Sequence, residues 1–283
     1  MKSLTDPFKL NNGVEIPCIG FGTWQTPDGD VAVSSVKEAI AAGYRHIDTA
    51  AIYGNEESVG RAVKQSGLPR RELFITSKLW NAHHGYENTR LAFEDTMKKL
   101  DTDYLDLYLI HWPNPVMFRD HWEEANAGSW KAFEEFYRAG RIRAIGVSNF
   151  RPHHIEALLK TATVAPQVNQ IRLCPGDIQE EVTDYCRRHQ ILLEAYSPLG
   201  TGTIFEVPLL QELAEKYKKS IAQICIRWSL QMGFLPLPKS VTPGRIRENT
   251  QVFDFEISAE DVKAIAALKG VVGYSKNPDE TNF

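Results

Sequence analysis

A short apolar run followed by an amphipathic helical segment recurs along most of this chain. The runs stay apolar from end to end, which is typical of strands buried on both faces. Regular alternation of strand and helix predicts a parallel sheet, and eight such units in one chain predict a (β/α)₈ TIM barrel. The expected strands are residues 16–21, 44–48, 74–78, 104–110, 142–147, 167–171, 191–196 and 234–237.

Two additions to the eight units are expected. Asn12-Gly13 favours a two-residue turn, so a β-hairpin over residues 8–16 should precede the barrel. Consecutive helical patterns at 207–217 and 221–232, and later at 245–251 and 259–268, indicate extra helices near the C-terminus. No linker or composition shift divides the chain, so we expect one barrel domain over residues 1–283.

A doubly wound Rossmann sheet is the alternative that the same alternation allows. Its dinucleotide fingerprint needs three glycines in the pattern G-x-G-x-x-G. Gly20-Phe21-Gly22 supplies only the first two, because Gln25 occupies the third position. The barrel is therefore the favoured fold.

The composition excludes several classes of protein. The chain is 43% hydrophobic and 24% charged, as in soluble globular proteins. A formal net charge of -4 argues against binding to nucleic acid or to an anionic membrane surface. No apolar run is long enough to span a membrane, and the first residues lack the apolar core of a signal peptide. We therefore expect a cytoplasmic protein.

The spacing of cysteines and histidines indicates no metal site. The histidine pairs at 83–84 and 153–154 are adjacent, and neighbours in sequence rarely point at one ion. The cysteines lie far apart and form no C-x-x-C pair, as in a reduced cytosolic protein with buried thiols. They are Cys18, Cys174, Cys186 and Cys225.

Three successive expected strands deliver titratable side chains at their ends. The second ends on Asp48, with Tyr53 in the loop that follows; the third ends on Lys78; and His111 follows the fourth. Active sites of TIM barrels lie at the C-terminal ends of the strands, and neighbouring strands are about 4.8 Å apart. These four groups should therefore converge.

The four groups suit proton delivery to an oxygen atom. A free phenol titrates near ~10, and a lysine beside Tyr53 favours the phenolate and eases proton donation. Asp48 is expected to hold Lys78 charged and oriented, and His111 to donate a hydrogen bond to a substrate oxygen. The set contains no hydride source, so carbonyl reduction would require a nicotinamide cofactor.

The second half of the chain offers groups for such a cofactor. Hydroxyl and amide groups at the ends of the fifth and sixth strands can bind a carboxamide, and Tyr196 after the seventh can stack on a nicotinamide ring. Lysine, serine and arginine before a helix after the eighth strand form an anion site, where this fold often holds phosphate. The side chains are Ser148, Asn149, Gln170, Lys239, Ser240 and Arg245.

Seven segments together resemble the aldo-keto reductase family over nearly the whole chain. They are GFGTW at 20–24, GYRHIDTAAIYGNE at 43–56, ITSKLW at 75–80, LDLYLIHWP at 105–113, GVSNF at 146–150, AYSPLG at 195–200 and PKSVTPGRIREN at 238–249. The chain is similar to prokaryotic-type, broad-specificity members of the 2,5-diketo-gluconate reductase kind. The resemblance implies an NADPH-dependent reductase of aldehydes and ketones, and we expect the protein to be a monomer.

The resemblance also implies roles for individual residues. The catalytic tetrad would be Asp48, Tyr53, Lys78 and His111, with Tyr53 as the general acid. The cofactor would contact Gly22, Thr23, Trp24, Asp48, Ser148, Asn149, Gln170, Tyr196, Ser197, Leu199, Gly200, Lys239, Ser240, Val241, Thr242, Arg245, Glu248 and Asn249. Of these, the 2′-phosphate would be held by Lys239, Ser240 and Arg245. The substrate pocket would be formed by Trp24, Tyr53, Trp80, His111 and Trp112.

One segment departs from the family pattern. The family usually follows the strand-6 glutamine with an acid and then His-Pro, whereas this chain reads Gln170-Ile171-Arg172-Leu173-Cys174-Pro175. Gln170 is retained, so the departure concerns the conformation of the loop that follows. The short tail after Gly270 and a modest loop at 112–128 predict an open site that accepts several aldehydes and ketones.

Two other functions fit part of the pattern. A Schiff-base lyase or aldolase on the same barrel would use Lys78 as its nucleophile, but it leaves the anion site and Tyr196 without a role. Borohydride trapping of a substrate on the lysine would detect it. A non-catalytic, cofactor-sensing barrel would not need a complete proton-delivery set, and steady oxidation of NADPH by an aldehyde would exclude it.

Overall fold

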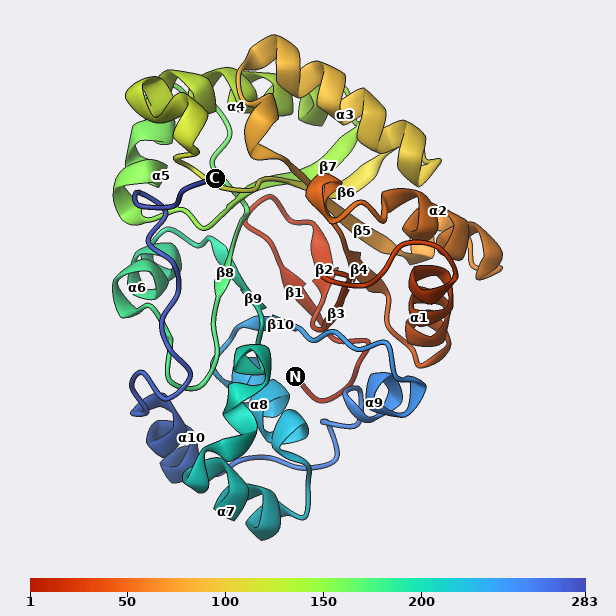
Figure 1. Cartoon of the computed structure of the whole chain (residues 1–283), viewed down its shortest axis with the longest axis vertical. Coiled ribbons are helices and arrows are strands. Elements are labelled where there is room, and N and C mark those ends of the chain that lie inside the picture. The colour runs from red at the N-terminus through yellow and green to blue at the C-terminus, as the bar shows by residue number, and fades with distance from the viewer.

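Eight parallel strands form the central ring of the protein in the computed structural model, which describes residues 1–283 (Figure 1). Neighbours in the sheet follow chain order from β3 to β10. The strands are β3 Gly20–Gly22, β4 His46–Asp48, β5 Phe74–Leu79, β6 Leu105–Ile110, β7 Ile142–Ser148, β8 Val168–Arg172, β9 Leu192–Tyr196 and β10 Leu235–Leu237. The predicted (β/α)₈ barrel is confirmed.

Helices connect the strands and surround the ring (Figure 1). They are α1 Asp30–Ala41, α2 Glu56–Gln65, α3 Tyr86–Leu100, α4 Trp122–Arg138, α5 Pro152–Leu159, α6 Glu180–Arg188, α7 Pro208–Tyr217, α8 Ile221–Gln231, α9 Pro243–Glu248 and α10 Ala259–Ala266. Two helices separate β9 from β10 and two follow β10, so the expected extra helices are present. No helix is both long enough and apolar enough to cross a bilayer.

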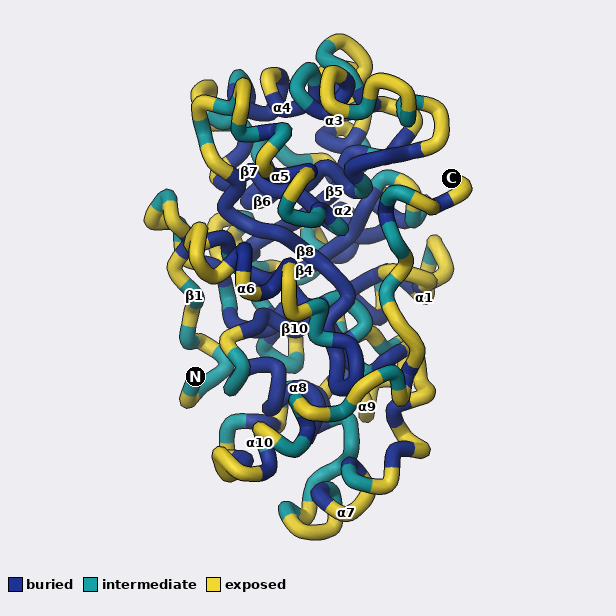
Figure 2. Tube along the Cα trace, turned by 90° about the vertical axis from the view of Figure 1, so that its left-hand side faces the viewer, coloured by how far each residue is buried: buried dark blue, intermediate teal, exposed yellow.

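Most strand residues are apolar on both faces of the sheet because the strands face two separate cores. On β6, Tyr108 and Ile110 pack into the large core between the barrel and its helices, whereas Leu107 and Leu109 point into the barrel. Figure 2 shows the result, with buried strands inside and exposed residues gathered on the outer helices. The interior core consists of Leu10, Ile16, Phe74, Leu107, Leu109, Ala144, Val168, Leu235 and Leu237.

An antiparallel hairpin precedes the barrel, as expected. It pairs β1 (Pro7–Lys9) with β2 (Glu15–Pro17). Its turn differs from the predicted two-residue form, because Leu10 N donates to Val14 O at 2.9 Å and three residues lie between them. The last of the three, Gly13, has a φ of +88°. A glycine in the left-handed region is what such a three-residue turn requires.

The hairpin plugs the end of the barrel at which the strands begin. Leu10 and Ile16 join the interior core, and Asn12 Nδ2 donates to the carbonyl oxygen of Arg143 at 3.1 Å, close to the start of β7. The interior is therefore closed by apolar side chains at this end. The cavity lies at the opposite end, where the strands finish.

The barrel closes where β3 meets β10. Gly22 N donates to Pro238 O at 3.1 Å across this seam. A side chain on β3 would prevent the approach, because a Cβ at Gly20 would lie 2.4 Å from Leu237 Cδ2 and 2.6 Å from His46 Nδ1. The two glycines thus serve barrel closure, consistent with their failure to match a dinucleotide fingerprint.

Two expected strands are shorter in the structure by more than one residue. The apolar run at 16–21 is divided between β2 and β3, because Ile16 and Pro17 pair with the other arm of the hairpin. The run at 44–48 contributes only its last three residues to the sheet. Tyr44 lies before β4 and packs edge to face on Phe21, with 5.6 Å between ring centroids.

The seam can be tested with Gly20→Ala. The added methyl group would overlap Leu237 and His46, which are both buried, so the free energy of unfolding is expected to fall by about 1–3 kcal/mol. Urea titration followed by circular dichroism measures the loss. Gly244→Ala is the control, since a Cβ there meets no heavy atom within 4 Å. Equal stability of Gly20→Ala and the wild type would contradict the tight seam.

Candidate active site

Four side chains meet at the C-terminal ends of neighbouring strands. Asp48 ends β4, Lys78 lies near the end of β5, His111 follows β6, and Tyr53 ends a short 3₁₀ turn after β4. Lys78 Nζ lies 2.7 Å from Asp48 Oδ1 and 3.4 Å from Tyr53 Oη. His111 meets Tyr53 edge to face, with 5.9 Å between ring centroids. The structure brings together the four groups that the sequence places at this edge.

Lys78 is buried, and its ammonium group donates to three oxygen atoms. Besides Asp48 and Tyr53, it reaches the carbonyl oxygen of Thr49 at 2.9 Å. Burial lowers the pKa of Lys78, but the nearby Asp48 and Tyr53 outweigh it and the net pKa is raised. Lys78 is therefore charged at neutral pH, in the state that the expected role of Asp48 requires.

The pKa of Tyr53 differs from the expectation that Lys78 makes it a stronger acid. Burial of the phenol raises this pKa most, Lys78 lowers it, and Asp48 raises it further. The net pKa lies above that of a free tyrosine, because burial outweighs the lysine. Tyr53 is consequently protonated at neutral pH and has a proton to donate.

His111 is uncharged in this site. Burial and the positive charge of Lys78 hold the pKa of His111 well below its usual value. Its Nδ1 atom is buried without a hydrogen-bond partner, which leaves Nε2 as the ring nitrogen open to the cavity. With its proton on Nε2, a neutral imidazole can donate a hydrogen bond to a substrate oxygen.

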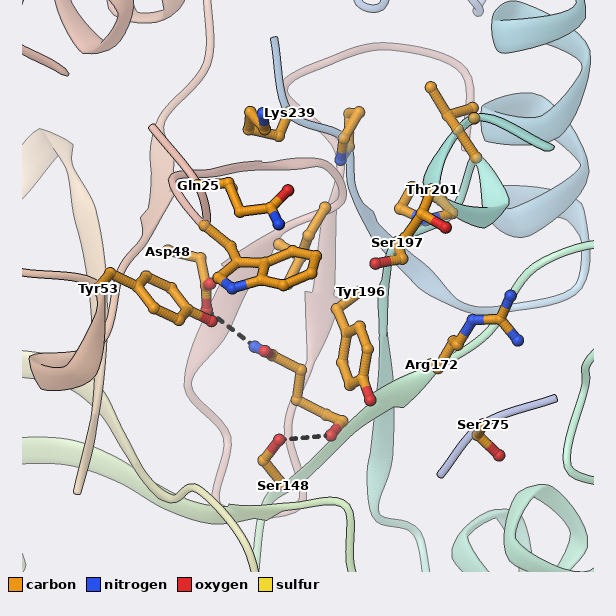
Figure 3. Close-up of a pocket in the computed structure, with 18 of the residues that line it drawn as sticks. Gln25, Asp48, Tyr53, Ser148, Arg172, Tyr196, Ser197, Thr201, Lys239 and Ser275 are labelled. Carbon is orange, nitrogen blue, oxygen red and sulfur yellow. Dashed lines mark hydrogen bonds between the residues drawn. The ribbon is translucent and has the colours of Figure 1, made fainter. Parts of the chain in front are cut away.

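The site lines a cavity of about 970 Å³. Figure 3 shows Asp48 and Tyr53 on one side of it, Tyr196 in the middle and Arg172 on the far side. Lys239, Ser240 and Arg245 line the same cavity, so one cavity joins the tetrad to the predicted anion site. The predicted residues on its lining are Gly22, Trp24, Asp48, Tyr53, Trp80, His111, Trp112, Ser148, Asn149, Gln170, Tyr196, Ser197, Leu199, Lys239, Ser240, Arg245, Glu248 and Asn249.

Five predicted residues lie outside this lining. Lys78 and Thr23 are fully buried behind it, and Thr23 Oγ1 donates to the carbonyl oxygen of Asp48 at 2.9 Å. The two residues thus support the site from below its surface. The other three, whose contact with a cofactor stays a prediction, are Gly200, Val241 and Thr242.

Asn149 and Ser148 hold their neighbours in place. Asn149 Nδ2 donates to His111 O at 3.0 Å and to Ser148 Oγ at 3.1 Å, and Asn149 Oδ1 accepts from Tyr196 Oη at 2.8 Å. Ser148 Oγ donates to the carbonyl oxygen of Gln170 at 2.8 Å. The ring of Tyr196, predicted to stack on a nicotinamide, is therefore fixed by the chain itself.

The amide of Gln170 joins Asp48 to a second buried carboxyl group. Its Nε2 donates to Asp48 Oδ2 at 2.8 Å and to Glu194 Oε2 at 2.7 Å. The sequence reasoning missed Glu194, although a signal was present. Glu194 and Tyr196 are two residues apart on β9, and side chains at i and i+2 of a strand face the same way.

The departure at Arg172 is explained by the C-terminal tail. Arg172 pairs with Asp177 at 2.6 Å, and both side chains are buried. The guanidinium also donates to the carbonyl oxygens of Val272 at 2.8 Å and Gly273 at 3.1 Å. Asp177 accepts in turn from Ser275 N at 2.7 Å. The loop after β8 therefore anchors the tail over the end of the barrel.

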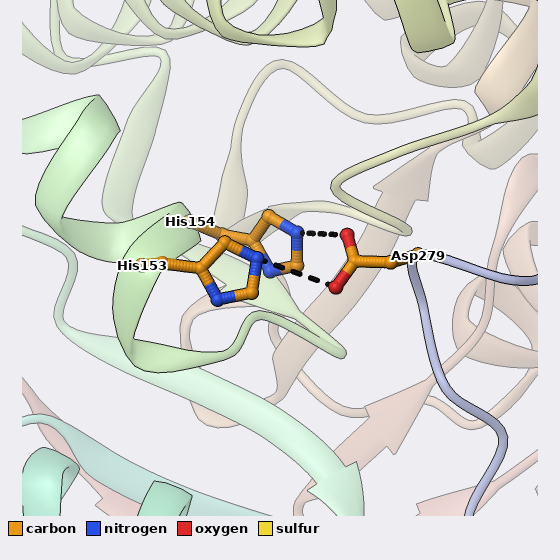
Figure 4. A group of neighbouring side chains, drawn as sticks. All are labelled: His153, His154 and Asp279. Atoms are coloured by element: carbon orange, nitrogen blue, oxygen red, sulfur yellow. Dashed lines mark hydrogen bonds and ion pairs between the residues drawn. The ribbon is translucent and has the colours of Figure 1, made fainter.

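A second anchor lies further along the tail (Figure 4). Asp279 Oδ1 accepts from His154 Nε2 at 2.8 Å and from Asn114 Nδ2 at 3.0 Å, and Asp279 Oδ2 lies 3.3 Å from His153 Nε2. These adjacent histidines do point at one group, but that group is a carboxylate. His154 Nδ1 accepts from Arg151 N at 3.1 Å, so Nε2 carries the proton and offers no lone pair to a metal.

The tail brings Phe283 to the cavity wall. Its ring stacks on Trp80 at 6.2 Å and meets Trp112 edge to face at 5.1 Å, measured between ring centroids. The site, predicted to be open, is thus bounded by the tail on this side. The sequence reasoning missed several lining residues: Gln25, Ile52, Arg172, Thr201, Phe205, Tyr274, Lys276 and Phe283. Ile52 lies within a family segment and Arg172 within the segment that departs from the pattern, but no motif marks the residues from Thr201 onward.

Known proteins share this sequence and fold. The profile of the Aldo/keto reductase family matches residues 18–269. Glyoxal reductase of Bacillus subtilis (strain 168) is 50% identical over 281 residues, 99% of each chain. Methylglyoxal reductase DkgA of Escherichia coli (strain K12) is 43% identical over 274 residues, 96% of each chain. The crystal structure of a Gox0644 mutant in complex with NADPH is 38% identical with a TM-score of 0.91, covering 99% of both chains. The chain belongs to the aldo/keto reductase family and is an oxidoreductase.

Lys78→Met tests the buried ion pair. The variant leaves the Asp48 carboxylate buried without its cation, and breaking a buried pair in this way costs about 3–5 kcal/mol of unfolding free energy. Lys64→Met is the matched control, because the pair of Lys64 with Asp101 has side chains 76% and 66% exposed and water screens it. Urea titration of both variants measures the difference. Equal losses would show that the Lys78 pair contributes nothing beyond a surface pair.

Proposed function

We propose that this protein reduces aldehydes and ketones to alcohols with NADPH as the hydride donor. The observation that carries the proposal is the Tyr53 hydroxyl group, 3.4 Å from a buried ammonium ion and on the wall of a cavity that also contains Lys239 and Arg245. A proton donor and an anion site in one cavity suit a carbonyl substrate and a phosphorylated cofactor. The reductases to which the chain is similar support the same chemistry.

The cavity lining fits a nicotinamide dinucleotide phosphate. Both N–H groups of Gln170 are bound inside the protein, so its Oε1 is left to accept a hydrogen bond from the carboxamide. Tyr196 offers a ring face held in place by its hydroxyl group. Lys239 and Arg245 are exposed cations that suit the 2′-phosphate. When bound, the nicotinamide would supply the hydride.

The chain itself would supply the proton. A carbonyl oxygen in the cavity can accept hydrogen bonds from Tyr53 Oη and from His111 Nε2. As negative charge develops on that oxygen, Tyr53 transfers its proton to it. Lys78, 3.4 Å away, stabilises the phenolate that remains, and Asp48 keeps the lysine charged.

A Schiff-base enzyme is less compatible with this site. A nucleophilic lysine needs a free amine and access to the substrate. Lys78 lies behind the cavity lining, its pKa is raised, and it is bound by Asp48 at 2.7 Å. A purely cofactor-sensing role is disfavoured as well, because it leaves the assembled proton donor without use.

Small aldehydes are the substrates that we would test first. The wall contributed by Trp80, Trp112 and Phe283 suits a small, partly apolar carbonyl compound. The named relatives act on glyoxal and methylglyoxal, which supports dicarbonyls within a broad specificity. A site built from one chain supports a monomer, and free, buried cysteines support the reducing cytoplasm.

Tyr53→Phe tests the proton donor. The change keeps the ring and removes the hydroxyl group, so NADPH should still bind and the fold should persist. Loss of a general acid slows a reaction by roughly 10²–10⁴-fold. NADPH oxidation with glyoxal, followed by absorbance, measures the rate. A variant within about threefold of the wild type would exclude Tyr53 as the donor, given the size of this effect.

Arg245→Ala tests the choice of cofactor. A charge-assisted contact to the 2′-phosphate should make NADPH binding weaker by about tenfold or more in the variant, whereas NADH binding should change little. Fluorescence titration with each cofactor measures both affinities. Added salt should weaken NADPH more than NADH, because it screens the exposed charges.

Arg247→Ala is the matched control for this experiment. Arg247 lies on the same helix, α9, but pairs with Glu38 and is not part of the cavity lining. It should leave both affinities unchanged. Equal losses for NADPH and NADH in Arg245→Ala would mean that Arg245 supports the loop and does not bind the phosphate.

A further inference from the structure

Glu194 lies two hydrogen bonds from the tetrad, through Gln170 and Asp48, and has no part in the proton transfer described above. It is in register with Gln170 on the neighbouring strand and is wholly buried inside the barrel. Its Oε2 accepts from Gln170 at 2.7 Å, whereas its Oε1 has no hydrogen-bond partner and lies 3.9 Å from His46 Nε2. Burying an acid with an unpaired oxygen atom is unfavourable for folding, so its presence here indicates that Glu194 has a function.

The position of Glu194 determines how the amide of Gln170 is oriented. Each N–H of that amide has its own acceptor, one on Asp48 at 2.8 Å and one on Glu194 at 2.7 Å. A half-turn of the amide would lose the bond to Asp48 and bring the amide oxygen against the Asp48 carboxylate. The oxygen of Gln170 is therefore held toward the cavity as an acceptor.

Glu194 keeps its proton near neutral pH. Burial raises the pKa of Glu194 to about 8, and the negative charge of Asp48 adds to the effect. The other charged or titratable groups that face it are Lys78 on β5 and His46 on β4. His46 is uncharged, because burial and the charge of Lys78 hold its pKa at about 3. A positive charge brought into the cavity would therefore lower the pKa of Glu194.

We propose that Glu194 is a positioning residue for the nicotinamide and couples the redox state of the cofactor to a proton. This inference rests on the proposed function, because it needs NADP(H). The nicotinamide ring is cationic in NADP⁺ and uncharged in NADPH. A cation held by Gln170 favours the carboxylate form of Glu194, so its O–H bond breaks and the proton passes to solvent. By linkage, NADP⁺ binds more tightly as the pH rises.

Isothermal titration calorimetry in two buffers of different ionisation enthalpy counts the protons released on binding. Just below the pKa of Glu194, about 8, the wild type should release more protons with NADP⁺ than with NADPH. The phosphates of the two cofactors are the same, so their contributions cancel in this difference.

Two substitutions separate positioning from proton release. Glu194→Gln keeps an acceptor for Gln170 but has no proton to lose, so the difference between cofactors should vanish while NADPH affinity stays within about threefold. Glu194→Leu also removes the acceptor and should weaken NADPH by roughly three- to tenfold. If the leucine variant fails to fold, the glutamine variant still decides the source of the proton.

The controls are two other ionisable groups. Glu56 is a buried carboxyl group with a raised pKa on α2, outside the cavity lining, so Glu56→Gln should leave the difference unchanged. Tyr53→Phe should also retain it. Loss of the difference in Tyr53→Phe would identify Tyr53 as the source and overturn the inference.

The remaining outcomes are equally decisive. A wild type that releases the same number of protons with both cofactors overturns the inference, as does a Glu194→Gln variant that retains the difference. The proposed function stands in both cases, because both cofactors bind. A wild type that binds neither NADPH nor NADP⁺ instead refutes the proposed function, and with it any role of Glu194 toward a nicotinamide.

Discussion

The buried ion pair of Lys78 with Asp48 is the constraint on which the site depends. Two charges inside an apolar barrel are tolerated only when protein groups replace the water around both. Lys78 therefore also donates to Thr49 and Tyr53, and the second oxygen of Asp48 accepts from Gln170. By satisfying the pair, the protein places the phenol on one side of it and the amide on the other. The proposed proton donor and the proposed cofactor contact belong to one network.

The barrel could be predicted from the sequence because one unit repeats and each unit buries both faces of its strand. The bounds of individual strands could not be predicted, since they depend on partners elsewhere in the chain. The sequence places Pro17 in a barrel strand, whereas the structure pairs it with the other arm of the hairpin. The sequence gives no role to Gly20 beyond an incomplete nucleotide motif, whereas the structure shows that β10 packs closely against it.

The candidate site could be predicted only in part, for a similar reason. Strand ends converge in any parallel barrel, so the meeting of Asp48 and Lys78 follows from their positions in sequence. The direction in which the pKa of Tyr53 shifts does not follow from the sequence. Burial opposes the effect of the lysine, and burial is a property of the folded state. Glu194 faces the same interior, but the sequence analysis considered only the last residue of its strand, Tyr196. The path of the tail could not be predicted, because no sequence motif marks it.

The tail is attached mainly through its backbone. Arg172 binds the carbonyl oxygens of Val272 and Gly273, and Arg119 binds that of Thr281 at 2.6 Å. Three side chains of the tail add to the attachment: Asp279 accepts from His154, Val272 packs into the outer core, and Phe283 packs on Trp80 and Trp112. Tyr274 and Lys276 line the cavity without taking part in these contacts. They can therefore be exchanged without detaching the segment that carries them. The barrel thus offers an evolvable, or engineerable, surface whose chemistry is separable from its anchorage.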